Sequence, residues 1–103
     1  PAPLFGSKGI RVDRLDVIGK EKNILRMTLS EPQSGTRLSA ISFDGYHQFL
    51  EMLKELYPTE DCAKMILSGQ LPHLLDIVYS VDINTYNGRS NVQLMLKDFR
   101  FAK

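Results

Sequence analysis

The spacing of hydrophobic residues changes from strand-like to helix-like and back again along the chain. Residues 24–30, ILRMTLS, alternate strictly, so that Leu25, Met27 and Leu29 share one face, as in a half-buried strand. Residues 10–18 are rich in β-branched side chains, but their apolar phase slips once, which predicts a strand with a bulge. The chain is therefore expected to begin with two strands joined by a polar turn.

A third strand is predicted at residues 37–43, RLSAISF, after a loop rich in turn-forming residues. Its inward face stays open, because Leu38 and Ala40 compete with Ile41 and Phe43 for the buried side.

The period becomes helical after Asp44, which is a plausible helix cap. Phe49, Leu53 and Leu56 recur at helical spacing, and Pro58 ends the predicted helix.

A second, shorter helix is predicted after Thr59 as its cap. Cys62, Met65 and Ile66 form its apolar stripe, and Gly69 supplies the stop. The buried position expected for Cys62 favours an inert thiol.

Two further strands, at about 75–86 and 89–99, flank the dipeptide Asn87-Gly88. This dipeptide favours a two-residue type I′ turn, so that paired residue numbers sum to 175. The predicted core-facing pairs are Ile83–Val92, Val81–Leu94 and Tyr79–Leu96. The pairs on the opposite face are Tyr86–Arg89, Asn84–Asn91, Asp82–Gln93, Ser80–Met95 and Val78–Lys97. Each core-facing pair is apolar on both strands, which supports this register.

The element order is three strands, a helical segment and two strands, in a mainly β chain with a helical insertion. This order is typical of the OB-fold, a five-stranded Greek-key barrel (β-β-β-α-β-β) with a helix between its third and fourth strands. Other five-stranded ββαβ-type folds and SH3-like folds are alternatives, although they do not usually carry such a helix there. We predict an OB-fold nucleic-acid-binding domain over residues 10–103 and a linker, or the remnant of a preceding segment, over residues 1–9.

Composition fits one modest domain of 103 residues, with 43% hydrophobic and 24% charged residues. The chain opens on Pro1 without an initiating Met, which suggests a fragment of a longer protein. No apolar run reaches the length of a membrane span, and no signal peptide is visible. The single cysteine, Cys62, excludes an intrachain disulfide and fits a reducing cytoplasm, so we expect a cytoplasmic protein without membrane partners.

Charge is unevenly distributed, although the net charge is only +1. Residues 1–43 carry a net charge of +3, residues 44–76 carry −4, and residues 77–103 carry +2. An anionic partner would therefore favour the outer thirds of the chain.

The non-core face near the predicted hairpin tip presents one ring, one guanidinium and three amides. Aromatic faces that stack bases and cations that follow phosphates are the usual means of binding single-stranded nucleic acid. The same residues also suit a local cross-strand contact with no ligand. The turn between the first two strands adds further cations. The candidate nucleic-acid-binding residues are Lys20, Lys22, Asn23, Arg26, Asn84, Tyr86, Arg89, Asn91, Gln93 and Lys97.

Residues 76–100, DIVYSVDINTYNGRSNVQLMLKDFR, resemble the C-terminal OB domain of RecJ-type single-stranded-DNA exonucleases. That family commonly ends its barrel with IN-x-(Y/F/W)-NG-(R/K) … QL-x-(L/V)-KD, which residues 82–98 match most specifically. Three further segments are similar to the family: PAPLF (1–5), VIGKEKNILRMTL (17–29) and AISF (40–43). The similarity covers almost the whole chain except the helical segment 46–74.

The resemblance implies a DNA-binding accessory domain of a repair or recombination nuclease. In such enzymes the chemistry belongs to separate N-terminal Asp-His-His domains that use Mg²⁺ or Mn²⁺. Here His47 and His73 are far apart without ligand spacing, and phosphate-loop or nucleophile motifs are absent. We therefore expect a fragment with no catalytic residue, no metal ligand and no cofactor of its own. Its expected partners are single-stranded DNA and the catalytic domains of the parent chain.

Two other functions remain open. The acidic helical segment 44–76, with Phe99 and Phe101, would suit a structural domain that docks on the catalytic core or on a replication partner. An RNA-binding OB domain is the third alternative.

Overall fold

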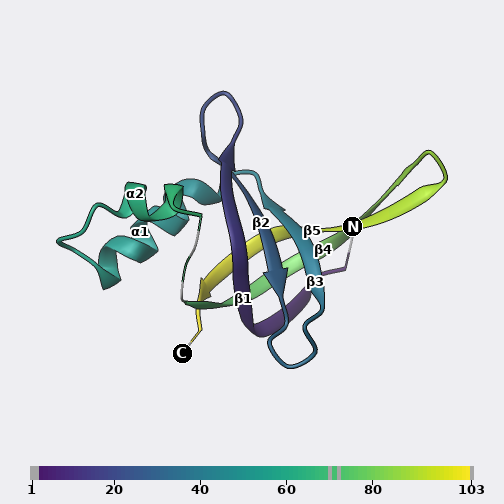
Figure 1. The fold of residues 1–103 in the computed structure, drawn as a ribbon, viewed down its shortest axis with the longest axis horizontal. Coiled ribbons are helices and arrows are strands. Elements are labelled where there is room, and N and C mark those ends of the chain that lie inside the picture. Colours follow the sequence, from purple (N-terminus) through teal and green to yellow (C-terminus); the bar gives the residue numbers. More distant parts are fainter. Residues whose placement is uncertain (1–2, 70, 72, 103) are drawn as a thin grey trace.

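The computed structural model describes residues 3–69, 71 and 73–102, with the exception of the Tyr86 side chain. Five strands and two helices follow one another in the predicted order (Figure 1). Their bounds are β1 (Phe5–Ile18), β2 (Ile24–Ser30), β3 (Arg37–Ser42), α1 (Gly45–Leu56), α2 (Cys62–Leu67), β4 (Leu74–Tyr86) and β5 (Arg89–Phe101).

The strands close into a barrel in the order β1-β2-β3-β5-β4. Neighbours pair antiparallel except β3 and β5, which run parallel. This is the OB-fold, as the element order predicts.

The first strand is longer than predicted and begins at Phe5 rather than Ile10. Its N-terminal part pairs with β4 from Phe5 opposite Tyr79, and its C-terminal part pairs with β2. Residues 5–9, expected as linker, therefore form part of the barrel wall. The predicted bulge lies between Val12 and Arg14, and a second irregularity precedes Ile10, where Gly9 takes a φ of 65°.

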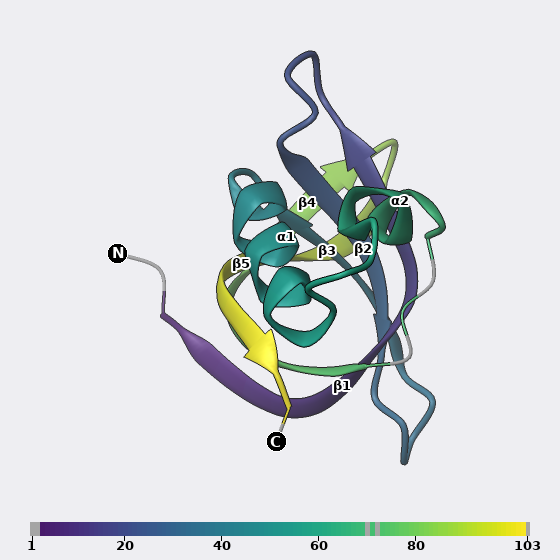
Figure 2. The same ribbon diagram turned by 90° about the vertical axis from the view of Figure 1, so that its left-hand side faces the viewer.

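The helices cover one end of the barrel (Figure 2). Phe49 and Leu53 of α1 are fully buried, and the Phe49 ring lies 5.7 Å from the ring of Phe99. Phe99 is itself buried, so it closes the core instead of offering a surface to another domain.

The caps differ in part from the prediction. Asp44 precedes α1, but its side chain makes no capping hydrogen bond. The predicted cap Thr59 is wrong for α2, because Asp61 occupies that position and accepts a hydrogen bond from the Lys64 backbone N–H at 3.1 Å. Gly69 follows α2 with a φ of 75°, in agreement with the predicted stop.

The inward face of β3 is the one that carries Ala40. Ala40 and Ser42 are buried, whereas Ile41 is half-buried on the outer face and Phe43 is exposed. The ladder explains this choice, because Ala40 pairs with the core residues Met27 and Leu94.

The hairpin register is confirmed from Tyr86–Arg89 to Tyr79–Leu96. Asn87 and Gly88 have φ values of 51° and 75°, as a type I′ turn requires. The register fails beyond Tyr79, where Val78 lies opposite Asp98 and not Lys97. A bulge at Lys97 is responsible.

The prediction that the outer hairpin pairs face the core is wrong. Ile83 is 64% exposed and Val92 is 45% exposed, whereas Leu94 is only 3% exposed. The reason is that the hairpin extends past the barrel wall as a projecting arm (Figure 1). We call residues 80–93 the hairpin arm.

Candidate nucleic-acid interface

The outer face of the sheet carries polar side chains in a continuous row from β1 to β4. Cross-strand pairing aligns neighbours directly, so their side chains stand side by side on one face. The row consists of Arg14, Thr28, Ser39, Gln93 and Asp82. Each of these side chains is exposed or half-buried, while the residues that alternate with them, such as Met27 and Leu94, are buried.

A second row lies beside the first and mixes charge with apolar surface. It consists of Asp16, Arg26, Ile41, Met95 and Ser80, and Ser80 at its end is buried. Ile41 and Met95 lie at its centre and are half-buried. They offer an apolar floor between the Arg26 guanidinium and the hairpin arm. We call the two rows together the outer face.

The hairpin arm continues the outer face beyond the barrel. Asn84 lies opposite Asn91, both exposed, and Arg89 is exposed at the tip. The backbone of Tyr86 pairs with Arg89, but the predicted stacking ring of Tyr86 lies outside the described residues. The three predicted amides, Asn84, Asn91 and Gln93, therefore lie on the same side of the sheet as Arg26.

The predicted lysines lie on a different projection. The β1–β2 turn is held by the Lys22 N–H, which donates to the Gly19 carbonyl at 3.2 Å, and Lys20 and Lys22 are exposed. The Asn23 carbonyl accepts from the Tyr46 N–H at 3.3 Å, which fixes the turn against the start of α1. Figure 1 shows this turn and the hairpin arm projecting from the barrel in different directions.

Lys97 lies outside the two rows of the outer face and outside the hairpin arm. It is exposed, but it sits in the β5 bulge between Leu96, which pairs with Tyr79, and Asp98, which pairs with Val78.

The Asp16 carboxylate forms ion pairs with both arginines of the outer face. The Asp16 Oδ2 lies 3.6 Å from the Arg26 Nη2 and 3.4 Å from the Arg14 Nε. Both arginine side chains are more than half exposed, so these are weak, screened ion pairs. Arg26 can therefore exchange Asp16 for an external anion.

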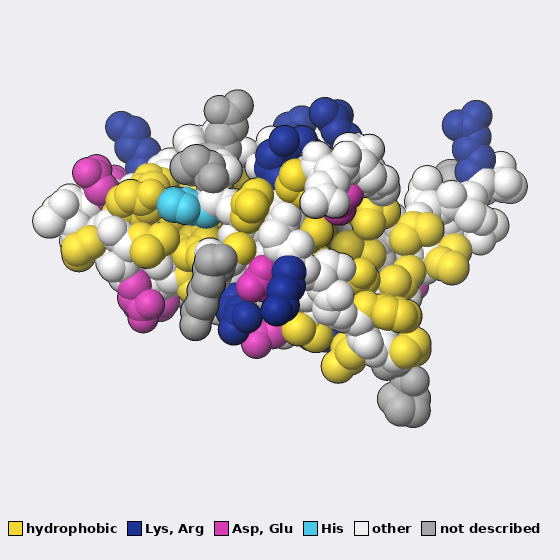
Figure 3. All heavy atoms as spheres, turned by 90° about the horizontal axis from the view of Figure 1, so that it is seen from below, with side chains coloured by type: hydrophobic (Ala, Val, Ile, Leu, Met, Phe, Trp, Pro, Cys, Tyr) yellow, Lys and Arg dark blue, Asp and Glu magenta, His cyan; other side chains and the backbone are white. Residues whose placement is uncertain are grey.

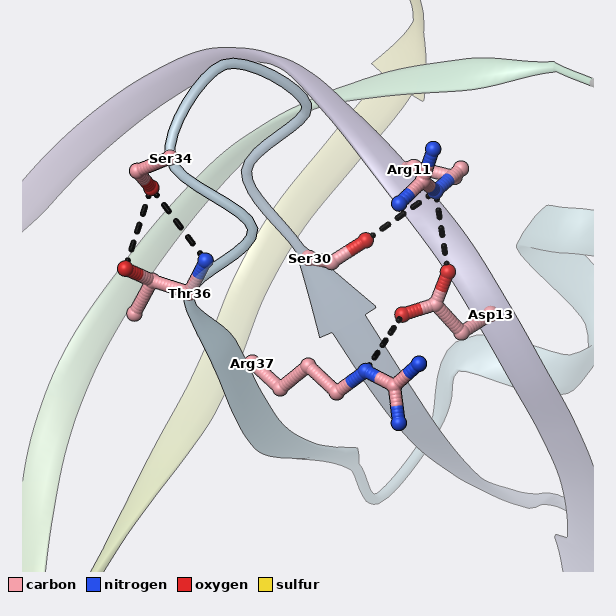
Figure 4. A network of polar contacts seen from close by, with 6 residues as sticks. All are labelled: Arg11, Asp13, Ser30, Ser34, Thr36 and Arg37. Atoms are coloured by element: carbon pink, nitrogen blue, oxygen red, sulfur yellow. Dashed lines mark hydrogen bonds and ion pairs between the residues drawn. The ribbon is translucent and has the colours of Figure 1, made fainter.

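A polar cluster borders the outer face at the end of β2 (Figure 4). The Arg11 Nε donates to the Asp13 Oδ1 at 2.9 Å and to the Ser30 hydroxyl at 3.1 Å, and the Arg37 Nε lies 3.7 Å from the Asp13 Oδ2. The neighbouring Ser30 hydroxyl first, and then Arg11 and Arg37, lower the pKa of Asp13 against the opposing effect of burial.

Residues that reasoning from the sequence missed make up much of the outer face: Arg14, Thr28, Ser39, Ile41 and Met95. Thr28 follows from the alternation around Arg26. The β3 residues do not, because their phase was open until the pairing with β5 fixed it.

The described part of the chain holds no group of three or more His, Cys, Asp and Glu side chains placed to bind a metal ion. His73 is engaged in the structure instead, since its Nε2 lies 2.6 Å from the Tyr57 hydroxyl. Cys62 is buried, with its Sγ 3.5 Å from the Tyr57 carbonyl. Among the same residues, no helix has the length and apolar character to cross a membrane.

A sequence model described as the RecJ OB domain matches residues 1–98. No curated protein sequence matches the chain. Among solved structures, the mitochondrial single-stranded DNA binding protein Rim1 of S. cerevisiae is similar at a TM-score of 0.62 and 11% identity, covering 100% of this chain and 98% of that one. The second single-stranded DNA binding protein (SSBb) of Mycobacterium smegmatis is similar at a TM-score of 0.50 and 10% identity, covering 93% of this chain and 81% of that one. With identities of 10–11%, these similarities establish a shared fold.

Proposed function

The chain belongs to the RecJ OB domain family, and on this premise we propose that it is a non-catalytic module that binds single-stranded DNA. The observation that carries this proposal is the outer face. It combines exposed arginines, an apolar floor at Ile41 and Met95, and a line of amides that runs onto the hairpin arm.

Each part of this surface matches a part of a single strand. Arg26 and Arg14 would bind phosphates, because a phosphate can displace the Asp16 carboxylate from these weak, screened ion pairs. Ile41 and Met95 would contact sugars and base faces, and the amides of Gln93, Asn91 and Asn84 would hydrogen-bond base edges. A duplex has its base faces covered, so the surface favours single strands.

The two projections would flank the bound strand. In OB-folds the turn between the first two strands and the turn between the last two are the usual walls of the binding site. Lys20 and Lys22 on one side, and Arg89 with Tyr86 on the other, would meet phosphates and a base. The solved structures with the same fold carry single-stranded DNA binding in their names, which supports this ligand.

The wider context is also proposed. The parent protein would be a RecJ-like exonuclease of DNA repair or recombination, in the cytoplasm, with its Mg²⁺- or Mn²⁺-dependent catalysis in other domains. The module would hold the substrate strand near that nuclease cleft. Because the net charge is only +1, binding by this chain alone should be weak, in the micromolar range, and steeply dependent on salt.

The test is fluorescence anisotropy of a labelled oligonucleotide at low salt, against the same sequence as a duplex. A Tyr86→Ala/Arg89→Ala variant should weaken single-strand binding by roughly tenfold or more, since one stacked base contributes about 1–3 kcal/mol. Lys54→Ala, which removes an exposed cation from α1, should change little.

The outcomes separate the parts of the proposal. Equal binding by the double variant would reject the arm as a contact. Absence of any binding would reject the function, and stronger competition by RNA than by DNA would change the ligand.

A second candidate function is docking on the catalytic domains through the acidic helical segment. Leu56 and Leu67 favour it, because they are 49% and 75% exposed on α1 and α2. Phe99 does not contribute, because it is buried, and Phe101 packs against Phe49 and His73. Loss of parent activity after Leu67→Asp, with DNA binding intact, would support this role.

A further inference from the structure

The hairpin arm has two chemically different faces. The amides of Asn84, Asn91 and Gln93 lie on the side of the arm that continues the outer face. The opposite face presents Val81, Ile83 and Val92, which are 41%, 64% and 45% exposed. Aliphatic side chains gathered on one side of a projecting two-stranded ribbon are unusual in a monomer, because such ribbons are only marginally stable when uncovered.

The barrel itself does not cover this aliphatic face. Within the described residues, pairing of β1 with β4 ends at Phe5–Tyr79, and pairing of β3 with β5 ends at Ser39–Gln93. The arm beyond these points has neither strand as a neighbour. Leu38, at the start of β3, is 36% exposed where the aliphatic face begins.

The aliphatic face continues into the open end of the barrel, opposite the helices. A shallow cavity of about 50 Å³ lies there, lined by Ile10, Leu29, Leu38, Tyr79 and Leu94 among others. The Phe5 ring lies 5.9 Å from the ring of Tyr79, which lines this cavity, and Phe5 and Leu4 are 47% and 60% exposed. Figure 3, seen from below, shows hydrophobic side chains over the right-hand part of the molecule, toward the hairpin arm, as well as over its left-hand part.

We propose that this aliphatic face is the contact surface of a homodimer, in which the arms of two copies pack face to face. The surface that each copy buries would be Val81, Ile83 and Val92, with Leu38 and Phe5 at its base. The amides on the other side of each arm would stay free, so dimerisation and the outer face do not compete.

A second copy is the occupant because this face is apolar and uncharged, so that an identical face can cover it. The side chains on this side of the arm are Val81, Ile83, Thr85, Ser90 and Val92, all uncharged. Two such faces pack without burying an unpaired charge, which is the costly event at interfaces. Thr85 and Ser90 already satisfy each other at the tip, with their hydroxyls 3.4 Å apart. A twofold contact of this kind also closes on itself and does not propagate.

The dimer should be weak, since few side chains per copy are available and small interfaces bind weakly. Sedimentation equilibrium of the 103-residue chain over a range of concentrations tests it. The expected result is a monomer–dimer equilibrium in the micromolar range, shifted at least tenfold toward monomer by Ile83→Asp. Asn84→Asp introduces the same charge one residue away on the other face, so it should leave the equilibrium within about twofold of the wild type.

Folding of each variant is checked by circular dichroism and thermal unfolding. A second measurement avoids dependence on a charged substitution: a Val92→Cys variant should form an intermolecular disulfide under mild oxidation, whereas Asn91→Cys should not. A monomer at every concentration would overturn the proposal and leave the face to a different protein. So would a dimer that Leu67→Asp disrupts and Ile83→Asp does not.

Discussion

Asp16 lies directly opposite Arg26 across β1 and β2, with its Oδ2 3.6 Å from the Arg26 Nη2. The same carboxylate oxygen lies 3.4 Å from the Arg14 Nε. One half-buried carboxylate therefore neutralises part of the charge of both Arg14 and Arg26 on the outer face. A nucleic-acid phosphate has to compete with Asp16 for them.

The first prediction concerns this competition. Asp16→Asn should tighten single-strand binding by roughly 3- to 10-fold at low salt and make its salt dependence steeper, because one repulsive charge is lost and two guanidinium groups are released. Anisotropy titrations at several salt concentrations measure both effects. Glu55→Gln removes the same charge from an exposed position on α1. Equal gains in the two variants would mean that only overall charge matters.

The second prediction concerns the junction between β3 and α1. Gly45 is buried at the start of α1, and a Cβ there would overlap the Ser42 hydroxyl, lie 2.8 Å from the Ser42 Cβ and 3.3 Å from the Phe99 ring. Gly45→Ala should therefore destabilise the fold by about 1–3 kcal/mol, although the same change in an open helix would stabilise it by about 1 kcal/mol.

Urea denaturation measures this change. Adding Ser42→Gly should recover much of the loss, since it removes both overlapping atoms, and the two substitutions should be strongly non-additive. If the changes in unfolding free energy caused by the two substitutions simply added, the junction between β3 and α1 would accommodate the added Cβ of Gly45→Ala without strain.

The third prediction concerns acid stability. The Gly9 N–H donates to the Asp76 Oδ1 at 3.0 Å, and the Arg100 Nε lies 3.2 Å from the Oδ2. The Gly9 hydrogen bond first, and then Arg100 and Lys8, hold the pKa of Asp76 below its ordinary 3.8, against the effect of burial. Asp76 thus stabilises the fold fully above that value and loses this contribution as the pH falls through its lower folded pKa.

Thermal unfolding between pH 5 and pH 2 tests this. Asp76→Asn should be less stable than the wild type at pH 5, and the difference should shrink toward pH 2. A difference that stays constant over the whole range would contradict the role of the ionised carboxylate.

Local chemistry was enough to predict the hairpin from the sequence. Asn87-Gly88 fixes the turn because few residue pairs accept two positive φ values, and the apolar alternation of both strands agrees with that turn. The prediction failed where a residue's position depends on how far its neighbours extend. The alternation of apolar residues predicts that Ile83 and Val92 share one side of the hairpin. It does not predict that the pairing with β1 and β3 ends before these residues and leaves them uncovered.

Other differences have the same origin in tertiary context. The inward face of β3 depends on its parallel pairing with β5, which has no local signature. The bulge at Lys97 moved Asp98 opposite Val78 and ended the predicted register. Asp61, and not Thr59, caps α2 because this helix begins at Cys62, two residues later than a Thr59 cap would place it. Reasoning from the sequence therefore found Arg26 and Gln93 of the outer face, through β2 and the hairpin, and the closure of the barrel supplied its other residues.

The most direct test of the outer face is an NMR titration of the ¹⁵N-labelled chain with a short single-stranded oligonucleotide. The largest chemical-shift changes should appear at Thr28, Ser39, Gln93 and Asn91, with the helices unaffected. Shifts confined to α1 and α2, or no shifts at a large excess of oligonucleotide, would contradict single-strand binding by this face.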